Sequence, residues 1–95
     1  MATYVQFHRA NYSDGFGVIE GSSVVCETIS ESGSNQQSAA GTRPLVTVCA
    51  TVAIFVAIGA DPNAATATTA RFFQPANVPT TYGIDHGHKV AVVTA

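Results

Sequence analysis

Asp85, His86 and His88 have the spacing closest to that of a metal site in this sequence. On a regular strand the two histidines would point to the same side, and Asp85 would supply a third ligand of a kind that zinc accepts. Gly87 between them is typical of a turn, where this alternation is lost. His8 could join them only through a tertiary contact. We therefore expect a polar hairpin tip without a metal, and a zinc site at these residues is the alternative.

No other pattern in the sequence is typical of catalysis. There is no Gly-x-Ser-x-Gly element, and the six acidic residues are scattered, mostly through segments predicted to be turns and loops. The segment 59–62, Gly-Ala-Asp-Pro, is not followed by the Gly-Lys-Ser/Thr and the helix that a phosphate-binding loop requires. We therefore expect no catalytic residue, no cofactor and no enzymatic activity.

Cys26 and Cys49 are the two cysteines, and their spacing matches neither a zinc site nor a redox motif. The first residues have neither the basic start nor the long apolar run of a signal peptide. A protein made and kept in the cytoplasm usually has reduced thiols. We therefore predict two free, buried thiols that pack as small apolar side chains, with a disulfide as the alternative.

The composition predicts one small apolar domain. The chain has 95 residues, which are too few for two cores, and it is 46% hydrophobic and 11% charged. Average soluble domains are about 25% charged. With four basic and six acidic residues, the net charge of -2 argues against a nucleic-acid partner. The longest apolar run, 45–60, is shorter than the roughly 20 residues of a membrane-spanning helix, so we expect no membrane partner.

Alternating apolar and polar residues predict β-strands through most of the chain. The run 45–60 is too long for one strand of a compact domain, so we expect a bend near Ala50 and Thr51. A turn at Asp14-Gly15 and a last hairpin around 85–88 complete the pattern. The segments predicted as strands are 4–8, 16–19, 24–29, 45–60 as two strands, 65–73, 80–84 and 89–94. They predict a single all-β domain over 1–95, a small antiparallel β-sandwich or jelly roll of about seven or eight short strands.

The two faces of the run 45–60 differ. Large branched side chains share one parity and are predicted to face the core: Val46, Val48, Val52, Ile54, Val56 and Ile58. Phe55 lies on the opposite face among small residues, where it covers either another subunit or a second sheet of the same monomer. Together with Phe72, Phe73 and Tyr82, it is a candidate interface residue.

Residues 30–42 are rich in Ser, Gln and Gly and contain no side chain large enough to anchor a core. We expect a flexible loop in this segment. It is either a solvated connector or an arm that becomes ordered on a neighbouring subunit.

Three elements of the second half occur in a suggestive order: Ala-Ile-Gly-Ala-Asp-Pro at 57–62, Pro-Ala-Asn-Val-Pro at 75–79 and Gly-His-Lys-Val-Ala-Val at 87–92. From Arg43 onward the chain resembles small virion proteins of tailed bacteriophages, whereas residues 1–30 show no such likeness. The resemblance implies a β-sandwich accessory protein of the particle, with a structural role.

On this resemblance we expect a capsid cement or decoration protein. It would be made in the host cytoplasm, reside in the virion and bind the outer surface of the major capsid protein shell, which it would stabilise. We expect a homo-oligomer, a trimer in preference to a dimer. One alternative is a tail, collar or head-fibre component of the same virion. The other is a small host-surface or carbohydrate-binding module that uses Tyr82 beside Asp85 and His86.

Overall fold

The computed structural model describes residues 2–13, 16–19, 25–66 and 70–95, with the backbone alone at 10–13 and 16–19. All regular secondary structure within these described residues is β-strand, so the predicted all-β class is confirmed. The turn predicted at Asp14-Gly15 lies outside the described residues. The strands are β1 (Ala2–His8), β2 (Ala10–Ser13), β3 (Phe16–Ile19), β4 (Val25–Ser30), β5 (Gln36–Gln37), β6 (Leu45–Ala50), β7 (Ile54–Gly59), β8 (Phe72–Gln74), β9 (Thr80–Gly83) and β10 (Lys89–Thr94).

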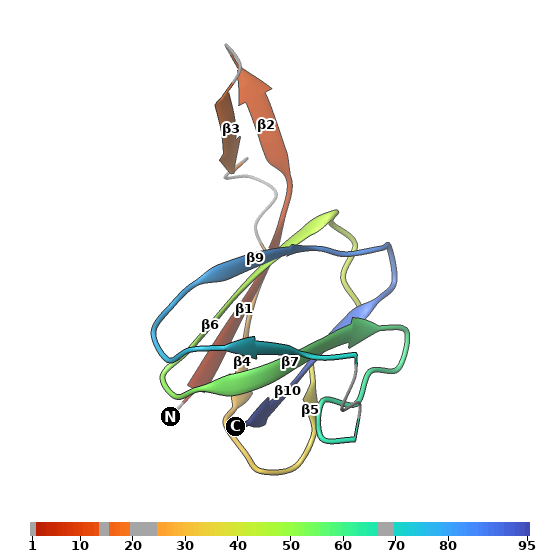
Figure 1. Ribbon diagram of the computed structural model, residues 1–95. Coiled ribbons are helices and arrows are strands. Elements are labelled where there is room, and N and C mark those ends of the chain that lie inside the picture. Colours follow the sequence, from red (N-terminus) through yellow and green to blue (C-terminus); the bar gives the residue numbers. More distant parts are fainter. Residues whose placement is uncertain (1, 14–15, 20–24, 67–69) are drawn as a thin grey trace.

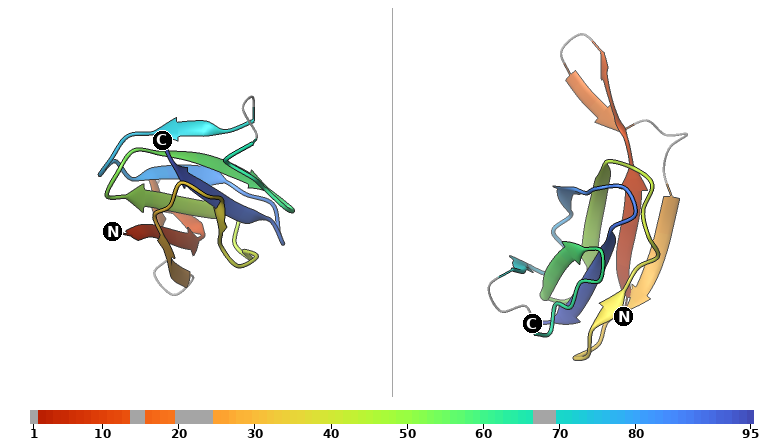
Figure 2. Two further views of the ribbon diagram at one scale, coloured as in Figure 1. Left: turned by 90° about the horizontal axis from the view of Figure 1, so that it is seen from below. Right: turned by 90° about the vertical axis from the view of Figure 1, so that its right-hand side faces the viewer.

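Eight of these strands form two four-stranded antiparallel sheets that stack as a sandwich (Figure 1). One sheet has the order β4-β1-β6-β9, and the other has the order β5-β10-β7-β8. The remaining strands, β2 and β3, pair with each other and stand off the sandwich as a hairpin, which Figure 2 shows from two further sides. The predicted β-sandwich is therefore confirmed. Its edge strands are β4 and β9 in one sheet and β5 and β8 in the other.

The core lies between the two sheets and consists of branched aliphatic side chains. The predicted parity of the run 45–60 is confirmed at Val46, Val48, Ile54 and Val56, each at most 1% exposed. Val52 and Ile58 pack against this core and are partly buried. Burial of each such side chain stabilises the fold by about 1.5–3 kcal/mol. The other buried residues of this core are Val5, Phe7, Ile29, Ala50, Ile84, Val90 and Val92.

The predicted bend is also confirmed. β6 ends at Ala50, and β7 begins at Ile54 in the opposite sheet. The chain therefore changes sheets within residues 51–53, and the same side-chain parity faces the same core from both sheets.

The last predicted hairpin is wrong. β9 pairs with β6 of one sheet and β10 pairs with β7 of the other, so residues 85–88 connect the two sheets. The reason lies in β10, whose four residues from Val90 to Val93 are all buried. A strand covered on both faces belongs inside a sheet, and β10 lies between β5 and β7. Its second face packs in a small cluster with Ala57 and Ala64.

The expectation that nothing in residues 30–42 anchors to the core is wrong, because the backbone does this work. Gln36 and Gln37 form β5 on the edge of β10. The Ser38 N–H donates to the Val90 carbonyl at 2.8 Å, and the Val90 N–H donates to Ser38 Oγ at 3.0 Å. Gly41 is buried so tightly that a Cβ there would overlap the Phe7 ring. Sequence reasoning looked for large side chains and missed these small ones.

Both cysteines are free, as predicted. Their predicted burial is wrong for Cys26, which is exposed on β4, and holds only in part for Cys49, which is half-buried on β6. Each has the opposite parity to a core residue of its own strand, Ile29 and Val48 respectively. Both thiols therefore lie on the outer face of the sheet.

Candidate interaction surface at the β8–β9 side

The predicted interface residues come together on one side of the sandwich. β8 and β9 are edge strands of different sheets, and the rings of Phe72 and Tyr82 meet between them with centroids 5.2 Å apart. Phe73 meets Phe55 of β7 edge-on, at 5.8 Å and 64°. These four residues, with the nearby Val78, form a cluster that we call the aromatic edge. Sequence reasoning proposed its four aromatic members separately. The fold brings them to the same side of the sandwich as two pairs on opposite faces of β8: Phe72, opposite the core residue Val56, meets Tyr82, and Phe73, opposite Phe55, faces away from the core.

Gln74 holds the two sheets together beneath the aromatic edge. Its side chain is 1% exposed and every polar group of its amide is satisfied. Nε2 donates to the carbonyls of Val48 at 2.6 Å and Val78 at 2.9 Å, and Oε1 accepts a hydrogen bond of 2.9 Å from the Tyr82 hydroxyl. Val48 lies opposite Thr80, the first residue of β9. Gln74 thus donates to the Val48 carbonyl of β6 at the position where the neighbouring strand β9 begins.

The Tyr82 hydroxyl is a donor to Gln74 and stays neutral. Burial raises the pKa of Tyr82 above its ordinary value of 10.0, and a side-chain hydrogen bond with Thr80 opposes this in part. In the structure the hydroxyl is engaged within the chain.

Phe55 supports the aromatic edge from within the same chain. The Arg71 guanidinium lies 3.7 Å from the centroid of the Phe55 ring, and Arg71 Nη1 donates to the Ala64 carbonyl at 3.0 Å. The Phe55 ring also contacts the ring of Phe73 and is half-buried. Both partners come from its own sheet and the loop before β8. Within the chain a second sheet therefore does not cover Phe55, and its contact with another subunit stays a prediction.

Three apolar side chains of the aromatic edge are open to a partner. Phe72 is 55% exposed, Phe73 60% and Val78 46%. Phe72 and Phe73 face opposite sides of β8, so this edge strand presents apolar rings on both of its faces. Exposed apolar side chains concentrated at one side of a soluble domain mark a surface that binds another surface. Val78, which sequence reasoning did not single out, sits within the Pro-Ala-Asn-Val-Pro element. The Pro-Ala-Asn-Val-Pro element is the feature of the sequence that could have drawn attention to Val78.

The predicted metal candidates lie on a turn. Asp85 and His86 are exposed and His88 is half-buried. Gly87, at φ 83°, makes the turn and donates its N–H to the Gly41 carbonyl at 2.8 Å. His8 Nε2 is 2.7 Å from Thr47 Oγ1. Across the described ranges, no three His, Cys, Asp or Glu residues lie close enough to hold a metal ion together.

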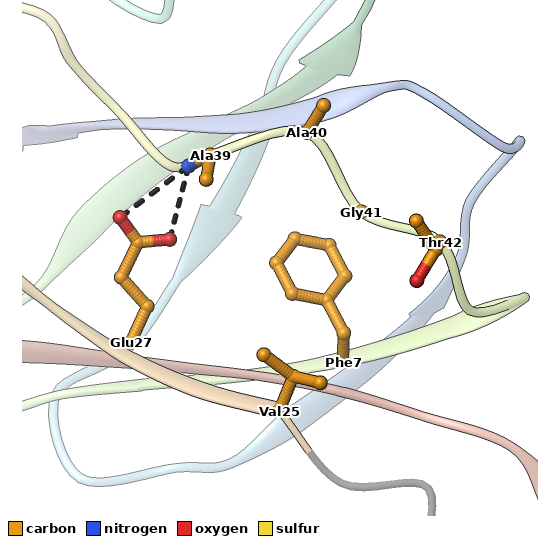
Figure 3. A pocket seen from close by; sticks show the side chains of 7 residues that line it. All are labelled: Phe7, Val25, Glu27, Ala39, Ala40, Gly41 and Thr42. Carbon is orange, nitrogen blue, oxygen red and sulfur yellow. Dashed lines mark hydrogen bonds between the residues drawn. The ribbon is translucent and has the colours of Figure 1, made fainter.

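A small cavity opens on the opposite side of the sandwich, beside β4 (Figure 3). Its volume is ≈ 60 Å³. Phe7, Val25 and residues 39–42 line it, and Glu27 closes one end by accepting hydrogen bonds of 3.0 and 3.3 Å from the Ala39 N–H. The carboxylate of Glu27 is thus held by the backbone, and apart from Glu27 and Thr42 the lining residues are apolar side chains and a glycine.

No family model, no curated protein and no solved structure matches this chain. Among the described residues there is no helix long and apolar enough to cross a membrane. The case for a function therefore depends on the two sides of the sandwich and on the sequence resemblance.

Proposed function

We propose that this chain is a non-enzymatic structural protein of a tailed-bacteriophage virion, a cement or decoration protein that binds the outer surface of the major capsid protein shell. The observation that carries the proposal is the aromatic edge, where Phe72, Phe73 and Val78 are each about half exposed at the β8–β9 side of the sandwich. The low charge of the chain and the elements of its second half support the same conclusion.

The aromatic edge is well suited to docking because it is already ordered. Phe72 rests on Tyr82 and Phe73 on Phe55, so binding immobilises few free side chains. Aromatic anchors on a rigid support are typical of residues that dominate binding energy. A protein that binds the assembled shell and not its dissociated subunits stabilises the shell by mass action.

The proposal is tested with capsids that lack this protein. We expect the purified chain to decorate them, and the double variant Phe72→Ala/Phe73→Ala to bind about 10- to 100-fold more weakly, the loss expected for removing two partly buried anchors. Tyr4→Ala is the matched control, because Tyr4 is 47% exposed on β1, away from the aromatic edge. Undecorated capsids, or equal binding by the double variant, would contradict the proposal.

The number of bound copies separates the shell from the other sites of the particle. A shell protein binds all over the capsid surface and in many copies. Binding confined to one vertex or to the tail would replace the cement role with that of a tail, collar or head-fibre component.

A further inference from the structure

The β2–β3 hairpin stands apart from the rest of the molecule. Its two strands pair with each other from Ala10 opposite Ile19 to Ser13 opposite Phe16, and within the described residues neither joins another sheet. Figures 1 and 2 show the hairpin projecting beyond the sandwich. An isolated two-stranded hairpin is only marginally stable in water. A third strand beside it would therefore stabilise it.

The edge of β4 offers such a strand. β4 is the outermost strand of its sheet, and no other described strand pairs with its free side. Natural edge strands are usually protected by charged side chains, proline or bulges. The exposed residues of β4 include no charge, since they are Val25, Cys26, Thr28 and Ser30. The one acidic residue, Glu27, is bound to the Ala39 N–H.

The hairpin and the β4 edge match each other in length and charge. Ala10–Ser13 and Phe16–Ile19 are four residues each and contain no charged residue, and β4 has six residues. An uncharged strand beside an uncharged edge avoids repulsion between like charges. The cavity of ≈ 60 Å³ beside Val25 has room for one small apolar side chain of an added strand.

In this arrangement the β2–β3 hairpin cannot pair with the free edge of β4 in its own chain. Only Arg9 separates β1 from β2, so the hairpin extends the line of β1 past the end of the sheet (Figure 1). Since β1 is the neighbour of β4, the hairpin lies beyond the end of β4 and not along it. A second copy has no such restriction.

We propose that the β2–β3 hairpin of one copy adds to the free edge of β4 in another copy. Backbone hydrogen bonds would supply the affinity, and the cavity would select the side chain that enters it, as in other cases of strand addition. Hairpin and edge are different surfaces, so the contact closes either as a reciprocal pair or as a ring. This inference does not rest on the proposed function, because it concerns the purified chain alone.

The first test removes the hairpin. Residues 10–23 are replaced by Gly-Ser-Gly, which the fold can accommodate because Phe7 lies opposite Val25 and the ends of β1 and β4 are already adjacent. In analytical ultracentrifugation we expect the natural chain to sediment as a multiple of its 9.8 kDa monomer mass and the shortened chain as a single, correspondingly lighter monomer. Far-UV circular dichroism checks that the shortened chain is still a folded β protein.

A second test leaves the hairpin in place and alters the edge. Cys26→Lys/Thr28→Lys adds two charges at exposed positions of β4, and we expect a monomer. The matched control, Ala65→Lys/Thr66→Lys, adds the same charge at exposed positions of the loop before β8 and should assemble like the natural chain. If the shortened chain fails to fold, this pair of variants decides. A monomeric natural chain, or assembly that survives the β4 substitutions, overturns the proposal.

Discussion

Gln74 provides the sharpest test of how the β8–β9 side is held together. Gln74→Ala removes three hydrogen bonds, and each contributes about 1 kcal/mol net to stability. It also leaves the Val48 carbonyl without this donor in a buried position, whereas the Val78 carbonyl and the Tyr82 hydroxyl are only part-buried. We expect a loss of about 3 kcal/mol in the free energy of unfolding.

Urea denaturation measures this loss, with Tyr82→Phe as the comparison. Tyr82→Phe removes only the hydrogen bond to Oε1 and should cost about 1 kcal/mol. In a domain of this size, about 3 kcal/mol corresponds to a fall in Tm of roughly 12–24 °C. A loss below 1 kcal/mol for Gln74→Ala would refute the assignment of Gln74 as the residue that joins the sheets.

Gln74→Glu adds a readout that a packing effect would not give. A carboxyl group at this 1% exposed position has its folded-state pKa raised by burial, because its charged form is penalised there. The variant should therefore be most stable below about pH 4.3, the unfolded pKa of Glu, and lose stability as the pH rises through the folded-state pKa. Gln74→Ala lacks this pH dependence. A flat pH profile for Gln74→Glu would show that the site is open to water.

Three further predictions concern the rest of the molecule. Gly41→Ala should lower the free energy of unfolding by about 1–3 kcal/mol, because its Cβ overlaps the Phe7 ring; Gly59→Ala, where the Cβ meets no atom within 4 Å, is the control for urea denaturation. Because the pKa of Tyr82 is raised above 10.0, its contribution to stability is fully present below about pH 10 and is lost as the pH rises through the folded-state pKa. Tyr82→Phe should therefore reduce the fall in Tm over this pH range. A fall in Tm as large as that of the natural chain would contradict the raised pKa. Ile54→Asp places an unpaired charge at a position 1% exposed, costs several kcal/mol and should leave no folded protein by circular dichroism.

The sequence predicted those features of the fold that local pattern determines. The parity of Val46, Val48, Ile54 and Val56 placed the core, because successive side chains of a strand point to opposite faces. The length of the same run predicted the bend near Ala50 and Thr51, where the structure shows that the chain passes from one sheet to the other. Both predictions depend only on residues close together in the chain.

The errors arose where distant residues decide the structure. Val90–Val93 is buried on both faces, yet a four-residue apolar run does not reveal which strand it will join. Residues 38–41 are anchored by backbone hydrogen bonds, which leave no mark on composition. Cys26 looked like a core residue by type, but its parity on β4 puts it outside. The sequence predicted the aromatic residues of the candidate surface but not Gln74 beneath them. Gln74 forms its hydrogen bonds with groups on β6, β9 and the loop between β8 and β9, which are distant in the sequence or unmarked by any local pattern.

The two sides of the sandwich are closed by different means, and this allows their proposed roles to be separated. On the β8–β9 side, Gln74 fills the gap between the sheets and leaves rigid aromatic side chains outside. On the β4–β5 side, Glu27 and the backbone of residues 38–41 leave a cavity beside an open edge. If the first side binds a shell and the second binds another copy, Phe72→Ala/Phe73→Ala should assemble normally while binding capsids about 10- to 100-fold more weakly. Loss of assembly in that variant would show that the aromatic edge, and not β4, joins the copies.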